Sequence, residues 1–263
     1  MKQLKKYMKT SLLLSIMSIC FFCSYKPKSS DVLPSSVQEE PIDLVYFPTD
    51  IFTKQTYQIR MDSLVKKLFK EKDLHLVESE LKRINQIHTR FYAMYWKAYL
   101  LYYTAVFYQN LRSEDDLAAK TIAQSLQTLQ EREYENSEYY ALLAQVTSFS
   151  IQFATITQLA RVSTAVETAA NHALELNKNN LRAYLVLASH NFHTPKMFGG
   201  MKKVETYALK GLACPDVIEN TEYSPTWGRN QLYHLLEQYY EQEGKTKALE
   251  ELHEKYNARQ STP

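Results

Sequence analysis

Apolar side chains recur at helical spacing along most of this chain, and that pattern limits the fold more than any other feature. Leu74, Val77, Leu81, Ile84 and Ile87, for example, follow one another at steps of three or four. No stretch alternates between apolar and polar residues for long enough to make a core strand. Gly and Pro, which the tight turns between strands require, number only 5 and 8 among 263 residues. The sequence therefore predicts an all-α fold.

The predicted helices are separated by short polar or glycine-containing breaks. They cover residues 59–69, 74–87, 90–110, 117–129, 138–156, 159–176, 181–192, 201–212, 226–242 and 246–256. Ser113 is expected to cap a helix whose first turn contains the acidic residues that follow it. The first helices of successive pairs begin near residues 91, 138, 181 and 228, about 47, 43 and 47 residues apart. Such a period is typical of an α-solenoid, in which stacked helix pairs share a core.

The N-terminal region reads as a targeting segment and a tether. Residues 1–23 are expected to be a secretory signal, because four lysines in the first nine residues precede an apolar run, SLLLSIMSICFFC. This run is shorter than the ~20 residues that a membrane-spanning helix needs. Neither Cys20 nor Cys23 follows a small residue, so lipidation at Cys23 or Cys20 and simple cleavage into the periplasm both stay open. Residues 24–54, which hold four of the eight prolines, are expected to be a flexible tether.

Residues 55–258 are predicted to form the folded domain, and residues 259–263 a disordered tail. The last unit of this domain resembles a tetratricopeptide repeat (TPR). The matching positions are Leu232, Leu235, Leu236, Tyr239, Gly244, Ala248 and Leu252. An earlier unit matches in the same way through Ala170, Ala173, Leu174, Asn177–Asn180, Tyr184, Leu187 and Ala188. The segment that follows it, His193–Gly200, is an insertion that an ordinary repeat of about 34 residues lacks.

The stretch from residue 174 to residue 212 resembles a group of small exported bacterial repeat proteins, in which a Y/F-x-T-P-x-x-F-G-G segment joins two helices. This group is similar to the T-component proteins of TRAP-type transporters, which are periplasmic lipoproteins with repeat-like helix pairs. The resemblance covers residues 90–258. It implies antiparallel helix pairs, stacked either as a TPR-like α-solenoid or as a compact helical-repeat bundle. A structural turn is expected at Thr194, Pro195, Phe198, Gly199 and Gly200.

An aromatic-rich helix over residues 90–110 provides the main candidate binding residues. One stripe of this helix carries Tyr92, Trp96, Tyr99, Tyr103 and Phe107, and an adjacent stripe carries Phe91, Tyr95, Ala98, Tyr102 and Ala105. Two interpretations stay open: a central helix buried on two sides, or a stripe that lines a groove for a peptide or an amphipathic ligand. The candidate contacts are Tyr92, Tyr95, Trp96, Tyr99, Tyr103, Tyr139 and Tyr140.

The residues argue against an active site, a metal site and a cofactor. The run from Gly199 to Lys203 lacks the glycine spacing and the Gly-Lys-Ser/Thr ending of a phosphate-binding loop. His190 and His193 are spaced as two metal ligands are, but no third ligand is evident, so packing at a helix end is preferred. Catalytic signatures such as G-x-S-x-G and H-E-x-x-H are missing. Without the four N-terminal lysines the net charge of +2 becomes about −2, which argues against nucleic acid as a partner.

The sequence thus predicts a non-enzymatic interaction module that is exported to the periplasm, with a lipid anchor as one of two options. Its expected ligand is a protein or peptide partner. The alternative is an accessory component of a transport system that binds an apolar or amphipathic small molecule.

Overall fold

The structure, a computed structural model, describes residues 56–131, 133–215 and 221–260. Over these ranges it contains ten α-helices and no strand, so the predicted all-α class is confirmed. The helices are α2 (Tyr57–Glu71), α3 (His75–Ile84), α4 (Arg90–Phe107), α5 (Asp115–Gln130), α6 (Ser137–Ser150), α7 (Ile156–Leu176), α8 (Leu181–His193), α9 (Val204–Ala213), α10 (Arg229–Gln242) and α11 (Thr246–Gln260). The predicted signal segment, its cysteines Cys20 and Cys23, and the predicted tether through residue 54 lie outside the described residues.

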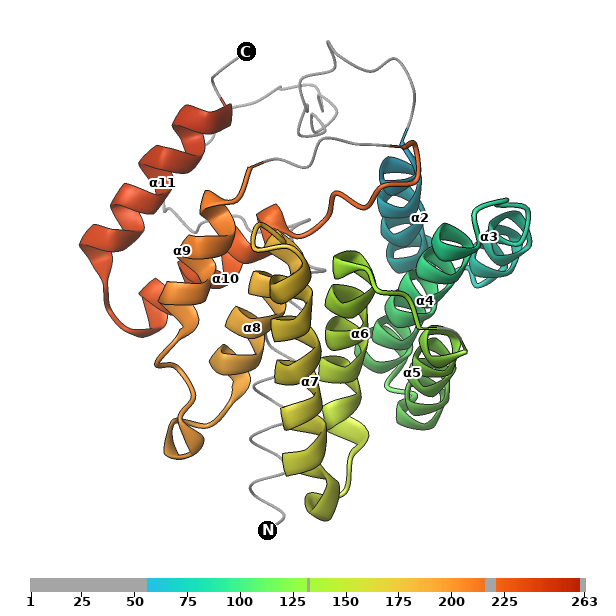
Figure 1. Cartoon of the computed structure of the whole chain (residues 1–263), viewed down its shortest axis with the longest axis horizontal. Helices are drawn as coiled ribbons and strands as arrows, with labels where there is room; N and C mark the ends of the chain where they lie inside the picture. The colour runs from blue at the N-terminus through green and yellow to red at the C-terminus, as the bar shows by residue number, and fades with distance from the viewer. Residues whose placement is uncertain (1–55, 132, 216–220, 261–263) are drawn as a thin grey trace, which may run out of the picture.

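Neighbouring helices in the sequence are also neighbours in space. The closest partners are α4 with α5, α6 with α7 and α8 with α9. Successive pairs are joined by contacts of α5 with α6, α7 with α8, α9 with α10, α6 with α8 and α8 with α10. Figure 1 shows the pairs following one another across the molecule, from α2 and α3 on one side to α11 on the other. Within the described ranges, no helix is both long and apolar enough to cross a membrane.

Side-chain caps set several of the helix starts. Asn136 accepts a hydrogen bond from the backbone N–H of Glu138 at 2.8 Å, and Asn180 accepts one from Ala183 at 3.0 Å. A capping box at Thr155 begins α7, so the helix expected over residues 138–156 ends at Ser150 and a short 3-10 turn follows it.

The end of α4 differs from the expectation. The helix becomes a π-helix at Tyr108–Arg112, and the backbone N–H of Ser113 bonds back to the Tyr108 carbonyl. Ser113 therefore lies in the left-handed region with a φ of 54° and ends this turn, while Glu114 takes the N-cap position of α5. The prediction that Ser113 caps α5 was wrong for this reason. At the C-terminus, α11 extends to Gln260, which is two residues beyond the expected end of the domain.

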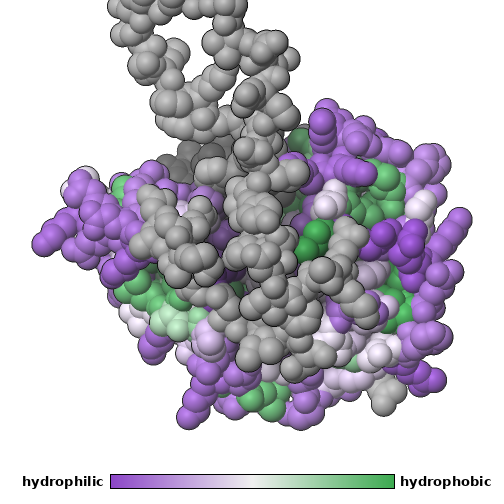
Figure 2. All heavy atoms as spheres, turned by 90° about the horizontal axis from the view of Figure 1, so that it is seen from above, coloured by the Kyte–Doolittle hydropathy of each residue, from purple (hydrophilic) through white to green (hydrophobic). Residues whose placement is uncertain are grey.

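The core runs through α4. From Tyr95 onwards every residue of this helix except the half-buried Lys97 is buried, and Tyr95 and Trp96 are 0% exposed. A helix with apolar side chains on all sides is buried on all sides, because each exposed face would cost free energy. In Figure 2, where the described residues are visible, the surface is mainly hydrophilic with smaller separate hydrophobic areas.

Candidate binding groove

The aromatic residues predicted as binding contacts, which we call the wall, lie mostly inside the protein. They are Tyr92, Tyr95, Trp96, Tyr99, Tyr103, Tyr139 and Tyr140. Tyr99 is 2% exposed, Tyr139 3% and Tyr103 9%. Tyr92 is only half-buried, and its hydroxyl lies 3.4 Å from the Ser224 hydroxyl. The buried rings pack against one another, with centroids 4.9 Å apart for Tyr99 and Tyr103. The structure therefore places most of these candidates in the core, as the first of the two interpretations requires.

The chain itself covers the wall through a crossing segment, defined as residues 221–228. The indole N–H of Trp96 donates to the Tyr223 carbonyl at 3.0 Å, and that of Trp227 donates to the Tyr95 hydroxyl at 2.8 Å. The Glu222 carbonyl accepts from the backbone N–H at the start of α2, at 2.8 Å. In Figure 1 the crossing segment runs from the N-terminal end of α2 to α10. The crossing segment thus joins the last helices to the first.

A buried ion pair between Arg182 and Glu138 contacts the crossing segment through a hydrogen bond to Trp227. Arg182 is 2% exposed, and its guanidinium donates to both carboxylate oxygens of Glu138 and to the Trp227 carbonyl, the last at 3.2 Å. Burial disfavours the charge of Arg182, but the neighbouring Glu138 carboxylate holds the pKa of the guanidinium above its ordinary value. The charges of Arg182 and Glu138 are therefore paired with each other inside the protein.

A small cavity remains beside the wall, between α4, α6, α8 and α10. Tyr99, Tyr103 and Trp227 contribute to its lining, and its volume is about 20 Å³. That is room for about one water molecule, whereas ligand pockets for small molecules occupy roughly 300–1,000 Å³. In this conformation the cavity does not accommodate the small amphipathic ligand of the alternative hypothesis.

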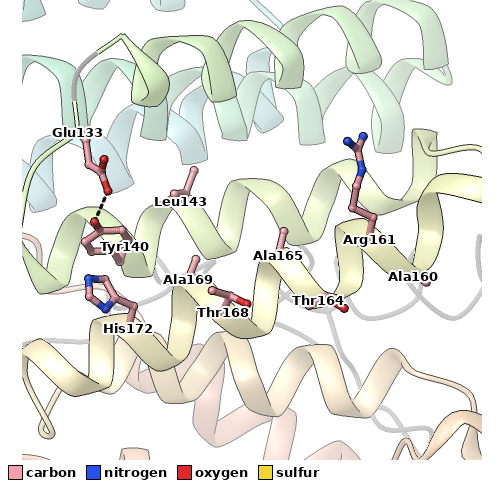
Figure 3. A pocket seen from close by; sticks show the side chains of 10 residues that line it. All are labelled: Glu133, Tyr140, Leu143, Ala160, Arg161, Thr164, Ala165, Thr168, Ala169 and His172. Carbon is pink, nitrogen blue, oxygen red and sulfur yellow. Dashed lines mark hydrogen bonds between the residues drawn. The ribbon is translucent and has the colours of Figure 1, made fainter.

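A much larger open groove, of about 780 Å³, runs along α7 beside α6 (Figure 3). One side is formed by Glu133, which precedes α6, and by Tyr140 and Leu143 of α6. The α7 side consists of Ala160, Arg161, Thr164, Ala165, Thr168, Ala169 and His172. These α7 positions recur at helical steps, so they share one face of the helix. The twelve steps from the first to the last of them correspond to a groove about 18 Å long.

The two ends of the groove differ in charge. At one end the Tyr140 hydroxyl donates to the Glu133 carboxylate, and the His172 ring meets the Tyr140 ring edge to face at 4.3 Å. His172 also contacts Glu175 at 2.9 Å and Glu135 at 3.2 Å, and hydrogen bonding to Glu175 raises the pKa of its imidazole. Arg161 lies towards the opposite end (Figure 3). The groove therefore combines a floor of small side chains with an acidic end and a basic end.

Of these lining residues, only Tyr140 belongs to the aromatic set that the sequence predicts as binding contacts. The Ala and Thr positions of α7 form an ordinary helical stripe in the sequence. Nothing in that stripe indicates that a neighbouring helix leaves it uncovered. Only the spacing of the α7 positions on one face could have suggested a common surface.

The other candidate residues are used within the fold. The His190 imidazole lies 2.9 Å from the Ser163 hydroxyl, and burial lowers the pKa of His193 to about 4. The Thr194 hydroxyl donates to the His190 carbonyl at 2.7 Å, where α8 ends. Within the part of the chain that the structure describes, no group of three or more His, Cys, Asp or Glu side chains is arranged to hold a metal ion.

Comparisons of this chain with protein-family models, with curated proteins and with solved structures found no match.

Proposed function

We propose that this chain is a helical-repeat interaction module that holds a short helix of a protein partner in the groove along α7. Its helix pairs would stack as tetratricopeptide repeats do. Two kinds of contact support this arrangement: α6 packs on α8 and α8 on α10, and each second helix of a pair packs on the first helix of the next.

The size of the groove carries the proposal. A length of about 18 Å matches about twelve residues, or just over three turns, of an α-helix. The Ala and Thr side chains on its α7 side allow a second helix to approach within the 8–10 Å between axes that packed helices adopt. Peptide helices are commonly bound in this way, with apolar anchors at steps of three and four.

The charges at the ends of the groove predict the direction of the bound helix. Glu133, Glu135 and Glu175 lie near one end, and Arg161 lies towards the other. The N-terminus of a helix carries a partial positive charge, and its C-terminus a partial negative charge. The partner helix is therefore expected to place its N-terminus, or a basic side chain, at the acidic end and its C-terminus or an acidic side chain near Arg161.

Selection of helical peptides tests the proposal without a known partner. Peptides of about twelve residues are selected for binding to the full chain, and their affinities are then measured for two variants. Thr168→Tyr fills the groove, whereas Thr246→Tyr makes the same change at an exposed position of α11 outside it. We expect Thr168→Tyr to weaken binding at least about tenfold and Thr246→Tyr to leave it unchanged.

A second variant tests the direction of the helix. Arg161→Glu should weaken peptides that carry an acidic C-terminal residue and strengthen peptides that carry a basic one there. If the selected peptides bind the Thr168→Tyr variant as tightly as the unchanged protein, the groove is not the binding site. We also propose export to the periplasm, on the basis of the signal-like first 23 residues. A lipid anchor at Cys20 or Cys23 and simple cleavage of the signal are the two options for its processing.

A further inference from the structure

The loop between α8 and α9 exposes two large apolar side chains next to each other. Met197 is 76% exposed and Phe198 63%, more than any other exposed large apolar residue among the described ones. The next most exposed, Ile156, is 52% exposed. Exposed apolar side chains that stand together are uncommon in soluble proteins and mark interaction sites, because water is displaced from both when they are covered. We call Met197 and Phe198 the loop tip.

The backbone holds the loop tip in this position. The N–H groups of Phe198 and Gly200 both donate to the Pro195 carbonyl, at 2.8 and 3.2 Å. Gly199 has a φ of 90°, a conformation that favours glycine, and a Cβ atom on Gly200 would lie 1.7 Å from the Thr194 carbonyl oxygen. The loop is therefore a hydrogen-bonded turn with a defined backbone conformation, and this turn carries the two exposed apolar side chains.

The base of the loop is also anchored to α8. The backbone N–H of Met201 donates to the Asn191 carbonyl at 2.9 Å, and that of Lys203 donates to the Asn191 side-chain oxygen at 2.7 Å. These bonds fix where the chain leaves the tip. As a result, the backbone at Met201 and Lys203, directly after the loop, is held against α8.

Three lysines lie close to the loop tip in the sequence. Lys196 precedes it, and Lys202 and Lys203 follow within five residues of Phe198. The carboxylate that comes next, Glu205, is bonded to Lys245 and Tyr240. Lys196 forms an ion pair with Glu243 at 2.8 Å, but both Lys202 and Lys203 are exposed. An apolar tip with amines behind it matches the interface of an anionic bilayer, where apolar side chains enter the acyl region and amines contact the headgroup phosphates.

We infer that the loop tip inserts into the surface of a membrane rich in anionic phospholipid, with Lys202 and Lys203 at the headgroups. This inference is independent of the groove along α7. Two features favour a lipid surface over a protein partner. The loop extends beyond the ends of α8 and α9 (Figure 1), and Lys202 and Lys203 add positive charge beyond that of Lys196, which is paired with Glu243. The protein would then meet the membrane through this loop in addition to any anchor at its N-terminus.

A tryptophan introduced at the loop tip measures this contact directly. The two natural tryptophans, Trp96 and Trp227, are 0% and 7% exposed, so they are shielded from lipid. The full chain carrying Phe198→Trp is mixed with vesicles of phosphatidylglycerol and phosphatidylcholine in equal parts, some with brominated acyl chains. The control, Leu117→Trp, places the same residue at a 43% exposed position that follows two aspartates.

We expect a blue shift and bromine quenching of the new tryptophan in Phe198→Trp and neither change in Leu117→Trp. Adding Lys202→Glu and Lys203→Glu to Phe198→Trp should weaken vesicle binding at the tip about tenfold or more at low salt. Absence of quenching in Phe198→Trp overturns the inference, and so does equal quenching in the control. A blue shift that grows with protein concentration in the absence of vesicles also overturns it, because a second copy of the chain would then cover the tip.

Discussion

Removing the indole of Trp227 tests whether the crossing segment is an integral part of the fold. Trp227 is 7% exposed, and its ring lies 5.9 Å from the Tyr99 ring, centroid to centroid. Its N–H donates to the Tyr95 hydroxyl at 2.8 Å, across 132 residues of sequence. Trp227→Ala therefore removes the contacts of this side chain with Tyr95 and Tyr99 of α4. The substitution does not change the backbone hydrogen-bonding groups of the crossing segment.

The expected cost follows from burial and from the lost hydrogen bond. Truncation of a buried tryptophan to alanine costs about 3–5 kcal/mol, depending on how far the site collapses. Trp227→Phe keeps an aromatic ring and loses the N–H group, which costs about 1–3 kcal/mol if the buried Tyr95 hydroxyl finds no other partner. For a domain of this size each kcal/mol lowers the melting temperature by about 2–4 °C. Trp227→Ala should thus melt roughly 6–20 °C below the unchanged protein.

Urea and thermal denaturation followed by far-ultraviolet circular dichroism provide the measurement. Phe198→Ala is the matched control, because Phe198 is an aromatic residue that is 63% exposed and should change the stability by less than about 0.5 kcal/mol. If Trp227→Ala is within about 1 kcal/mol of the control, the crossing segment does not contribute to the core and our description of the buried wall is wrong.

Three further changes test the core and its ionisable groups. Tyr99→Ala should lower the stability by about 3–5 kcal/mol in urea denaturation, because Tyr99 is 2% exposed; a loss below 1 kcal/mol would point to a groove-lining role instead. Burial raises the pKa of Glu80, but hydrogen bonds from Arg60 and Tyr57 outweigh it and hold this pKa below 4.5. The ionised carboxylate therefore stabilises the fold above its unfolded pKa and loses this effect as pH falls through the folded pKa. Glu80→Gln should thus cost about 1–3 kcal/mol at neutral pH and progressively less as the pH falls below 4.5. Because burial lowers the pKa of His193 from 6.5 to about 4, the unfolded chain takes up this proton first; stability should fall as pH decreases from 6.5 towards 4, and His193→Phe should flatten that slope.

The sequence by itself determined the secondary structure, because helical spacing and caps are local properties. The start of α7 is one example: Thr155 and Gln158 stand three residues apart, and the Gln158 side-chain oxygen accepts a hydrogen bond from the Thr155 backbone N–H at 3.0 Å. The same local signals were less reliable at Ser113, where the end of α4 relaxes into a π-helix and shifts the cap by one residue. The all-α class was predictable because the remaining pattern left no segment suited to a strand.

The role of the aromatic stripe was decided only by tertiary structure. A buried helix and a groove-lining helix show the same spacing of aromatic residues, so the sequence left both interpretations open. The crossing segment settles where these rings lie, since Trp227 reaches Tyr95 from 132 residues away. The groove along α7 has the same origin: its Ala and Thr side chains are unremarkable locally, and they form a surface only because α6 leaves one side of them open. Contacts between distant segments depend on how complete helices pack, and this information is not contained in any local stretch of the chain.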